Sequence, residues 1–198
     1  MSRRLAWPLL GVGMLLLWPG EASAHLLPGT ATGFLAGLAH PVSGLDHVLA
    51  LVSVGIWGAQ LGAPALWLLP VAFPMMMAIG GFLGLLGVPL PGVEVGIALS
   101  ALGLGTAILL QWRPPLAAAL LVVAAFAVFH GYAHGTELPP GESGLIYSLG
   151  FVLATGCLHL LGITAGFAHR WSWGARMLQG TGAGVALGGL FFLWQACA

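Results

Sequence analysis

The segment "GLAHPVSGLDHVLAL" (residues 37–51) places three ionisable side chains, His40, Asp46 and His47, inside a run of otherwise apolar residues. An ionisable group in hydrocarbon costs on the order of 2.5–3.5 kcal/mol, so such groups persist where they pair, line a wet cavity or bind a ligand. The segment therefore leaves two interpretations open. Its polar groups either hold helices together by hydrogen bonds or line a binding site.

The composition of the chain is that of an integral membrane protein. Of its 198 residues, 59% are hydrophobic and only 5% are charged, lysine is absent, and the mean hydropathy is +1.02. No water-soluble domain has this balance. The 32 glycines are spread through apolar segments, as expected where membrane helices pack closely. We expect an all-α integral membrane protein whose partner is the lipid bilayer and which binds no nucleic acid.

The first 24 residues have the pattern of a secretory signal peptide. Arg3 and Arg4 precede an apolar stretch from Leu5 to Trp18, and a small-x-small motif, Ala22–Ala24, follows. The alternative is an uncleaved helix, but fourteen residues span only about 21 Å. Cleavage after residue 24 would leave residues 25–198 as a transmembrane domain that begins at His25, whose amine and imidazole form a candidate chelate for a metal ion.

Turn residues and charges divide the mature chain into six apolar segments, each near the length of about 20 residues that a bilayer core requires. These segments are residues 31–58, 65–87, 92–112, 116–136, 144–167 and 175–196. Because the connections are short, we expect a compact bundle in which consecutive helices are antiparallel and often adjacent. The two halves would have opposite orientations and each opens with a histidine-bearing helix, which raises the hypothesis of a 3+3 inverted repeat.

The few charges predict the orientation of the bundle. With the mature N-terminus outside, Arg113, Arg170 and Arg176 all face the cytoplasm, as the positive-inside rule requires, while Glu137 and Glu142 face outward. The tryptophans of an interfacial belt agree, since five lie at the predicted cytoplasmic ends: Trp57, Trp67, Trp112, Trp171 and Trp173. We expect a multi-pass protein of the bacterial inner membrane with both mature termini in the periplasm.

The spacing of the first polar group argues against a simple metal site in a regular helix. His40 and His47 are seven residues apart, which places them within about 20° of one face but about 10 Å apart along the axis. One ion with ligand bonds of about 2 Å does not reach both. Either they are successive positions along a path, or Pro41 and Gly44 distort the helix. Asp46 points about 100° away from His47 and is a candidate to orient an imidazole.

The segment "FHGYAHGTE" (residues 129–137) contains the second polar group. His130, His134 and Glu137 fall at about 0°, +40° and −20° on a helix, in a single stripe. Two neutral imidazoles one turn apart can reach one metal ion, and the carboxylate adds an oxygen ligand. Solvation of a helix end is the alternative, and it accounts for Glu137 better than for the histidines.

Other polar residues extend the pattern. Under the predicted orientation Glu94 lies near the outer end of the third helix, so an entering cation would meet acidic groups, then imidazoles, then the deeper Asp46 and His47. His159 on the fifth helix is either an exit position or a packing residue. His169, beside Arg170, is typical of an interface.

With these motifs together, the chain resembles the HupE/UreJ family of nickel permeases over essentially its whole length. The shared features are the signal peptide, six short spans, the H-x5-D-H pattern at residues 40–47 and the F-H-G-x-A-H-G-x-E pattern at residues 129–137. The resemblance implies uptake of Ni²⁺ for nickel enzymes such as hydrogenase or urease. The path residues that it implies are His40, Asp46, His47, His130, His134 and Glu137, with Glu94 and Phe73 matching shorter motifs.

The chemistry of the side chains is compatible with this function but less specific. Imidazole and carboxylate ligands suit Ni²⁺, Co²⁺, Zn²⁺ and Cu²⁺ alike, and the order of affinities does not select nickel. No phosphate-binding loop is present in the sequence, so neither ATP hydrolysis nor an ATPase subunit is implied. We expect facilitated diffusion or secondary transport from periplasm to cytoplasm, with the metal ion as substrate, no permanently bound cofactor and no enzymatic activity.

Two other classes use intramembrane histidines. A membrane haem protein needs axial ligands on opposite faces of the ring, which the one-turn histidine pair at residues 130 and 134 fits poorly. A membrane metalloenzyme would use the same histidines and carboxylates to hold a catalytic metal. The sequence contains no obvious nucleophile or substrate pocket pattern for such an enzyme.

Overall fold

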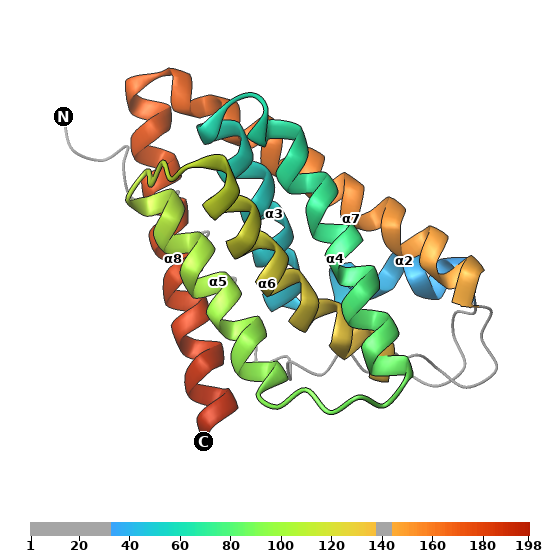
Figure 1. Ribbon diagram of the computed structural model, residues 1–198. Helices are drawn as coiled ribbons and strands as arrows, with labels where there is room; N and C mark the ends of the chain where they lie inside the picture. The colour runs from blue at the N-terminus through green and yellow to red at the C-terminus, as the bar shows by residue number, and fades with distance from the viewer. Residues whose placement is uncertain (1–32, 138–143) are drawn as a thin grey trace.

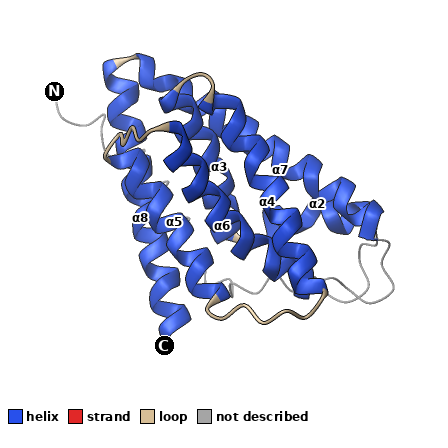
Figure 2. Cartoon of the chain, in the orientation of Figure 1, coloured by secondary structure: helices blue, strands red, loops and turns tan. Residues whose placement is uncertain are grey.

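The computed structural model describes residues 33–137 and 144–198, and in this part of the chain helices are joined by loops and turns, without a β-strand (Figure 1, Figure 2). The predicted signal peptide and His25 lie outside the described residues. The elements are α2 (Phe34–Ser43), α3 (Leu45–Leu61), α4 (Ala65–Leu85), α5 (Val93–Leu109), α6 (Leu116–Thr136), α7 (Gly144–Gly166), the 3-10 turn η1 (Phe167–Arg170) and α8 (Ser172–Cys197). The all-α prediction is confirmed.

Four helices of the described chain are long and apolar enough to cross a membrane: α4, α6, α7 continued through η1 (Leu145–Arg170), and α8. The bent pair α2 and α3 would add a fifth span. Helix α5 has 17 residues, about 25 Å of helix, which is slightly less than the bilayer core. The protein is a multi-pass membrane protein. The number of six spans stays a prediction, although the six expected segments coincide closely with these helices.

The first predicted span is broken in the middle. Helices α2 and α3 meet at Gly44 with a bend of 84°, and Gly44 is extended, with φ −101° and ψ 120°. Pro41 has no N–H to donate within α2, which weakens the turn before the break. The hydroxyl of Ser43 donates to the carbonyl of His40 at 2.7 Å and so satisfies one group at the end of α2. The sequence left two alternatives for this segment, a regular helix with His40 and His47 as successive positions or a distorted helix, and the structure shows the distorted helix.

The closest helix pairs are not consecutive in the chain. Helix α4 packs on α6, α5 on α8, and α7 on both α2 and α3. Glycines allow this approach, because a Cβ at Gly80 would overlap the backbone of Val128 and a Cβ at Gly162 the backbone of Val52. The sequence predicts that consecutive helices are often adjacent, and α3 does contact α4 and α5 contacts α6, but the closest pairs are formed by helices that do not follow each other in the chain. Small residues face helices that are distant in sequence.

The charges are distributed unequally between the two ends of the bundle. The connections α3–α4, α5–α6 and α7–α8 gather at one end, at the top of Figure 1, and they contain or adjoin Arg113, Arg170 and Arg176. At this end Trp57 Nε1 donates to the carbonyl of Trp112 at 3.0 Å, and the two rings stack with centroids 5.7 Å apart. Acidic side chains begin α5 and end α6 at the opposite end.

The glycine contacts of α8 generate a test of the packing. A Cβ at Gly189 would overlap the backbone of Leu102 on α5, whereas a Cβ at Gly180 on the same helix meets nothing within 4 Å. We expect Gly189→Ala to destabilise the protein by about 1–3 kcal/mol, because the α5–α8 pair must separate. Gly180→Ala is the matched control and should be neutral or stabilising by up to about 1 kcal/mol. Thermal unfolding in detergent measures both, and equal effects of the two changes would contradict this packing.

Candidate metal centre

One histidine pair joins the short helix α2 to α6. His40 Nε2 lies 2.7 Å from His134 Nδ1, the ring centroids are 4.5 Å apart, and the two side chains are 4% and 9% exposed. Glu137, at the end of α6, places Oε2 3.7 Å from His40 Nε2. One ligand atom from each of these three residues lies within 4.8 Å of the others, so the three together can hold a metal ion.

A second histidine pair lies beside the first. The ring of His47, on α3, has its centroid 4.6 Å from that of His130 and 4.6 Å from that of His134, both on α6. His130 is completely buried. Since His134 contacts both His40 and His47, the four imidazoles form one continuous cluster, which we call the four-histidine cluster (His40, His47, His130 and His134).

Asp46 orients the imidazole of His47. Its Oδ1 lies 3.0 Å from His47 Nδ1 and also accepts the backbone N–H of His47 at 2.8 Å. When Nδ1 donates to this carboxylate, Nε2 carries a lone pair. Nε2 of His47 is buried without a partner in the described part of the chain. A carboxylate that holds the far nitrogen of a histidine is the usual arrangement at metal ligands, because it sets the tautomer and raises the basicity of the ligand.

Ser100, on α5, orients the imidazole of His130. Its hydroxyl donates to the carbonyl of Ile97 at 2.6 Å and lies 2.7 Å from His130 Nε2. A hydroxyl has one proton to donate, so the contact with His130 requires Nε2–H to be the donor. His130 Nδ1 then carries a lone pair, and this buried atom has no partner among residues 33–137 and 144–198.

The ring nitrogens without partners carry an energetic cost. Nε2 of His47, Nδ1 of His130 and Nε2 of His134 are all buried and unpaired in the described residues, and each such group costs about 1–3 kcal/mol. A metal ion bound at one of these atoms would satisfy it, and a different pair, His40 Nε2 and His134 Nδ1, lies near enough to share one ion. Two imidazole nitrogens at right angles on one ion, each about 2.1 Å from it, lie about 3.0 Å apart, so the 2.7 Å spacing of the His40–His134 pair needs to open only slightly.

The structure rearranges the ligand pairs that the sequence indicates. The one-turn pair His130 and His134 was expected to serve one ion, but His134 groups with His40 and Glu137, while His130 faces His47. The cause is the break at residue 44, which turns the two histidines of the first span toward different turns of α6. Pairs formed across helices therefore replace the pair formed along one helix.

Glu94 lies outside the four-histidine cluster. It lines a cavity of about 160 Å³ between α3, α5 and the end of α8, together with Asp46 and Gln195. Asp46 thus borders this cavity while its Oδ1 contacts His47. This cavity therefore contains two carboxylates, those of Asp46 and Glu94, next to the four-histidine cluster.

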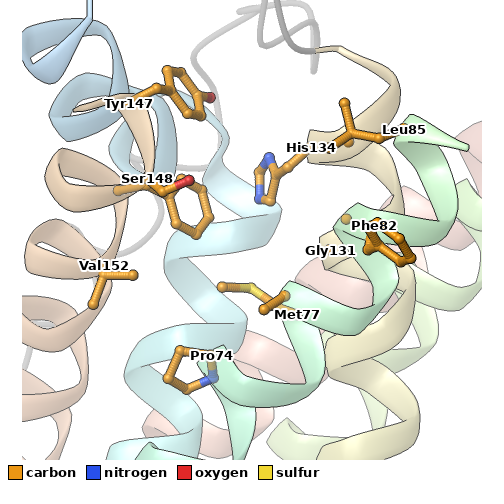
Figure 3. A pocket seen from close by; sticks show the side chains of 13 residues that line it. Pro74, Met77, Phe82, Leu85, Gly131, His134, Tyr147, Ser148 and Val152 are labelled. Atoms are coloured by element: carbon orange, nitrogen blue, oxygen red, sulfur yellow. The ribbon is translucent and has the colours of Figure 1, made fainter. Parts of the chain in front are cut away.

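A second cavity, of about 340 Å³, lies between α4, α6 and α7. Figure 3 shows His134 directed into it from α6, opposite Tyr147 and Ser148 of α7 and Met77 of α4. Apart from His134, Tyr147 and Ser148, its lining side chains are apolar. This cavity gives the four-histidine cluster an apolar flank on the side away from Glu94.

Sequence reasoning missed several residues around the cluster. Ser100 stands in an apolar run without a motif, and intramembrane serines commonly bond to their own helix, so nothing distinguished it. Tyr147 and Phe151 of α7 place their rings against His40, with centroids 5.9 and 6.2 Å away, and Phe151 lies 4.5 Å from His134. These aromatic side chains were indistinguishable from lipid-facing ones in the sequence.

The chain is similar in sequence to known proteins. The family profile described as HupE / UreJ protein matches residues 13–192. The chain is 44% identical over 179 residues to Protein HupE of Rhizobium leguminosarum bv. viciae, which covers 90% of this chain and 93% of that protein. No solved structure matches the chain.

The hydrogen bond between Ser100 and His130 generates a second test. We expect Ser100→Ala to weaken binding of Ni²⁺ about 10- to 100-fold, because His130 loses the acceptor that fixes its tautomer. The matched control is Thr106→Val, since the Thr106 hydroxyl on the same helix donates to Leu102 O at 2.7 Å in a similar way. Equilibrium binding of ⁶³Ni to purified protein measures the effect. Equal affinities for Ser100→Ala and the unaltered protein would contradict the assigned role.

Proposed function

This chain belongs to the HupE/UreJ family, and from that premise we propose that it carries a divalent transition-metal ion, foremost Ni²⁺, from the periplasm into the cytoplasm. The observation that carries the proposal is the four-histidine cluster, in which four buried imidazoles from two membrane segments meet and two are already oriented by Asp46 and Ser100. The ion would supply hydrogenase or urease, as the family resemblance implies.

The arrangement of the carboxylates supports a route through the cluster. Asp46 and Glu94 share one cavity beside it, and Glu137 lies near His40 at the other flank. Carboxylates at the outer end attract a cation, and the imidazoles then replace its water ligands one after another. A divalent ion in a medium of low polarity needs nearby negative charge, and Asp46 and Glu137 supply it on both sides of the imidazoles.

The rival classes have less support from the geometry. The four rings contact one another with centroids 4.5–4.6 Å apart, which leaves no room for a porphyrin between them. The family is of the transporter type, which is consistent with a protein that is not an enzyme. A haem protein or a membrane metalloenzyme therefore remains the lesser interpretation of the same histidines.

The distribution of charge supports a periplasmic location for both mature termini. Arg113, Arg170 and Arg176 gather at one end of the bundle (Figure 1), as expected for a cytoplasmic face in the bacterial inner membrane. Counting six spans, with α2 and α3 as the first, gives the described C-terminus the opposite side. The carboxylates and the four-histidine cluster then lie toward the periplasm, where the ion arrives.

The helix pairing supports the 3+3 inverted repeat. In such a repeat, α2 with α3 is equivalent to α6, α4 to α7, and α5 to α8. The contact between α3 and α7 in one half is then equivalent to the contact between α6 and α4 in the other. The contact between α5 and α8 joins two equivalent helices, so exchanging the halves leaves it unchanged. These are three of the closest contacts in the described chain. In many transporters the substrate binds where two such repeats meet, and the four-histidine cluster lies between α3 and α6, the first helices of the two halves.

Replacing cluster residues tests the transport function. We expect His130→Ala and Asp46→Ala each to abolish uptake of radioactive nickel in a nickel-starved host, because the first removes a ligand and the second removes the charge that orients His47. His169→Ala is the control, since His169 bonds to Gly166 O at the opposite end of the bundle. Immunoblots confirm that each variant reaches the membrane. Unchanged uptake in both variants would contradict the proposed path.

The membrane potential tests the energy source. For an ion with two charges, 100 mV is worth about 4.6 kcal/mol, so facilitated diffusion predicts a tenfold change in the internal-to-external ratio of free ion for each 30 mV, approximately. Proteoliposomes with potassium diffusion potentials measure this ratio. Accumulation that stays within this slope supports diffusion driven by the potential. Accumulation above it would show coupling to a second ion and contradict simple diffusion.

A further inference from the structure

Two buried polar side chains on α7 have no part in the four-histidine cluster. His159 is 3% exposed and Thr155 is 1% exposed. Neither His159 Nε2 nor Thr155 Oγ1 has a hydrogen-bond partner within residues 33–137 and 144–198. They are one turn apart, so their side chains share a face of the helix. Each of these two buried groups lacks a polar partner in the described residues, which carries a cost in free energy.

One aromatic ring contacts both His159 and a histidine of the four-histidine cluster. Phe73 on α4 is completely buried, and its ring centroid lies 5.5 Å from that of His130 and 5.7 Å from that of His159. The Phe73 ring thus links His159 to the cluster through His130. No other aromatic side chain of the described chain is recorded in contact with His159.

The α7 pair lies deeper in the bundle than the cluster. Helices α3 and α7 run side by side in the same direction (Figure 1), and a Cβ at Gly55 would overlap the backbone carbonyl of His159. Gly55 is eight residues beyond His47 on α3, which is about 12 Å along the helix. His159 therefore lies between the cluster and the arginine-bearing end of the bundle.

We propose that His159 Nε2 and Thr155 Oγ1 form a second, inner binding site for the transported divalent cation, next to the Phe73 ring. This inference rests on the proposed transport function and names a further site within it. The inner site offers one nitrogen and one hydroxyl oxygen, with water completing the coordination. Its protein ligands are fewer than those of the cluster and carry no charge, so it binds the ion more weakly, and a weak last site favours release of the ion.

Counting bound ions tests the inner site. We expect purified protein in detergent to bind two ⁶³Ni²⁺ ions per chain, one tightly and one weakly. His159→Ala should bind one ion, keep the affinity of the tight site within about twofold, and lose about tenfold or more of its ⁶³Ni²⁺ uptake in proteoliposomes. Thr155→Val, which keeps the volume of the side chain, should weaken only the second site. His169→Ala is the histidine control and should match the unaltered protein in every measurement.

The outcomes separate this inference from the transport function. If the unaltered protein transports nickel and His159→Ala matches it in stoichiometry and uptake, the inner site is wrong and the transport function stands. One ion per chain in a protein that transports would also overturn the inner site, since water or packing alone then accounts for the pair. If the unaltered protein neither binds nor transports nickel, both proposals fail. If His159→Ala misfolds and loses both ions, the Thr155→Val variant decides. A weak site with unchanged affinity in Thr155→Val overturns the proposal, and a weak site with lower affinity supports it.

Discussion

The break between α2 and α3 is the constraint on which the rest of the structure depends. In a straight helix His40 and His47 would lie about 10 Å apart along one face. The 84° bend at Gly44 instead directs His40 toward His134 and leaves His47 between His134 and His130. Three helices, α2, α3 and α6, then contribute four imidazoles to one buried cluster. Pro41 and the extended Gly44 would weaken an ordinary helix, and here the break at these residues brings four imidazole ligands close together.

In addition to the break between α2 and α3, the residues around the cluster hold its imidazoles in fixed orientations. Asp46 and Ser100 each occupy one nitrogen of a ring and leave the other available. Phe151 and Tyr147 close the cluster on the side of α7, and glycines let α6 approach α4 at backbone distance. Oriented ligands lose little rotational freedom when an ion binds. The same packing excludes lipid from the buried polar groups, which would otherwise be costly in the membrane.

Much of the fold followed from the sequence, because each apolar segment between turn residues is helical near the expected bounds, although the first forms two helices, α2 and α3. The histidines of the candidate site were also indicated by the sequence, since ionisable groups are conspicuous in hydrocarbon, and their role in binding a metal ion stays a prediction. The break at Gly44 remained one of two alternatives, because membrane helices tolerate both proline and glycine. Ser100 was missed, and the pairing of His134 with His40 was not foreseen, because both depend on helices that are distant in sequence. Glycines on one face of a helix indicate close packing, but they do not identify the partner helix.

The coordination shell of the bound ion tests the central claim most directly. X-ray absorption at the nickel edge, on purified protein loaded with one equivalent of Ni²⁺, reports the type and number of its nearest neighbours. The bent first span and α6 together predict a shell of nitrogen and oxygen at about 2.1 Å with the outer-shell scattering of at least two imidazoles. In the His40→Ala/His47→Ala variant the imidazole scattering should fall markedly. A shell of sulfur, a shell of water oxygens without imidazole, or a spectrum unchanged in that variant would contradict the account.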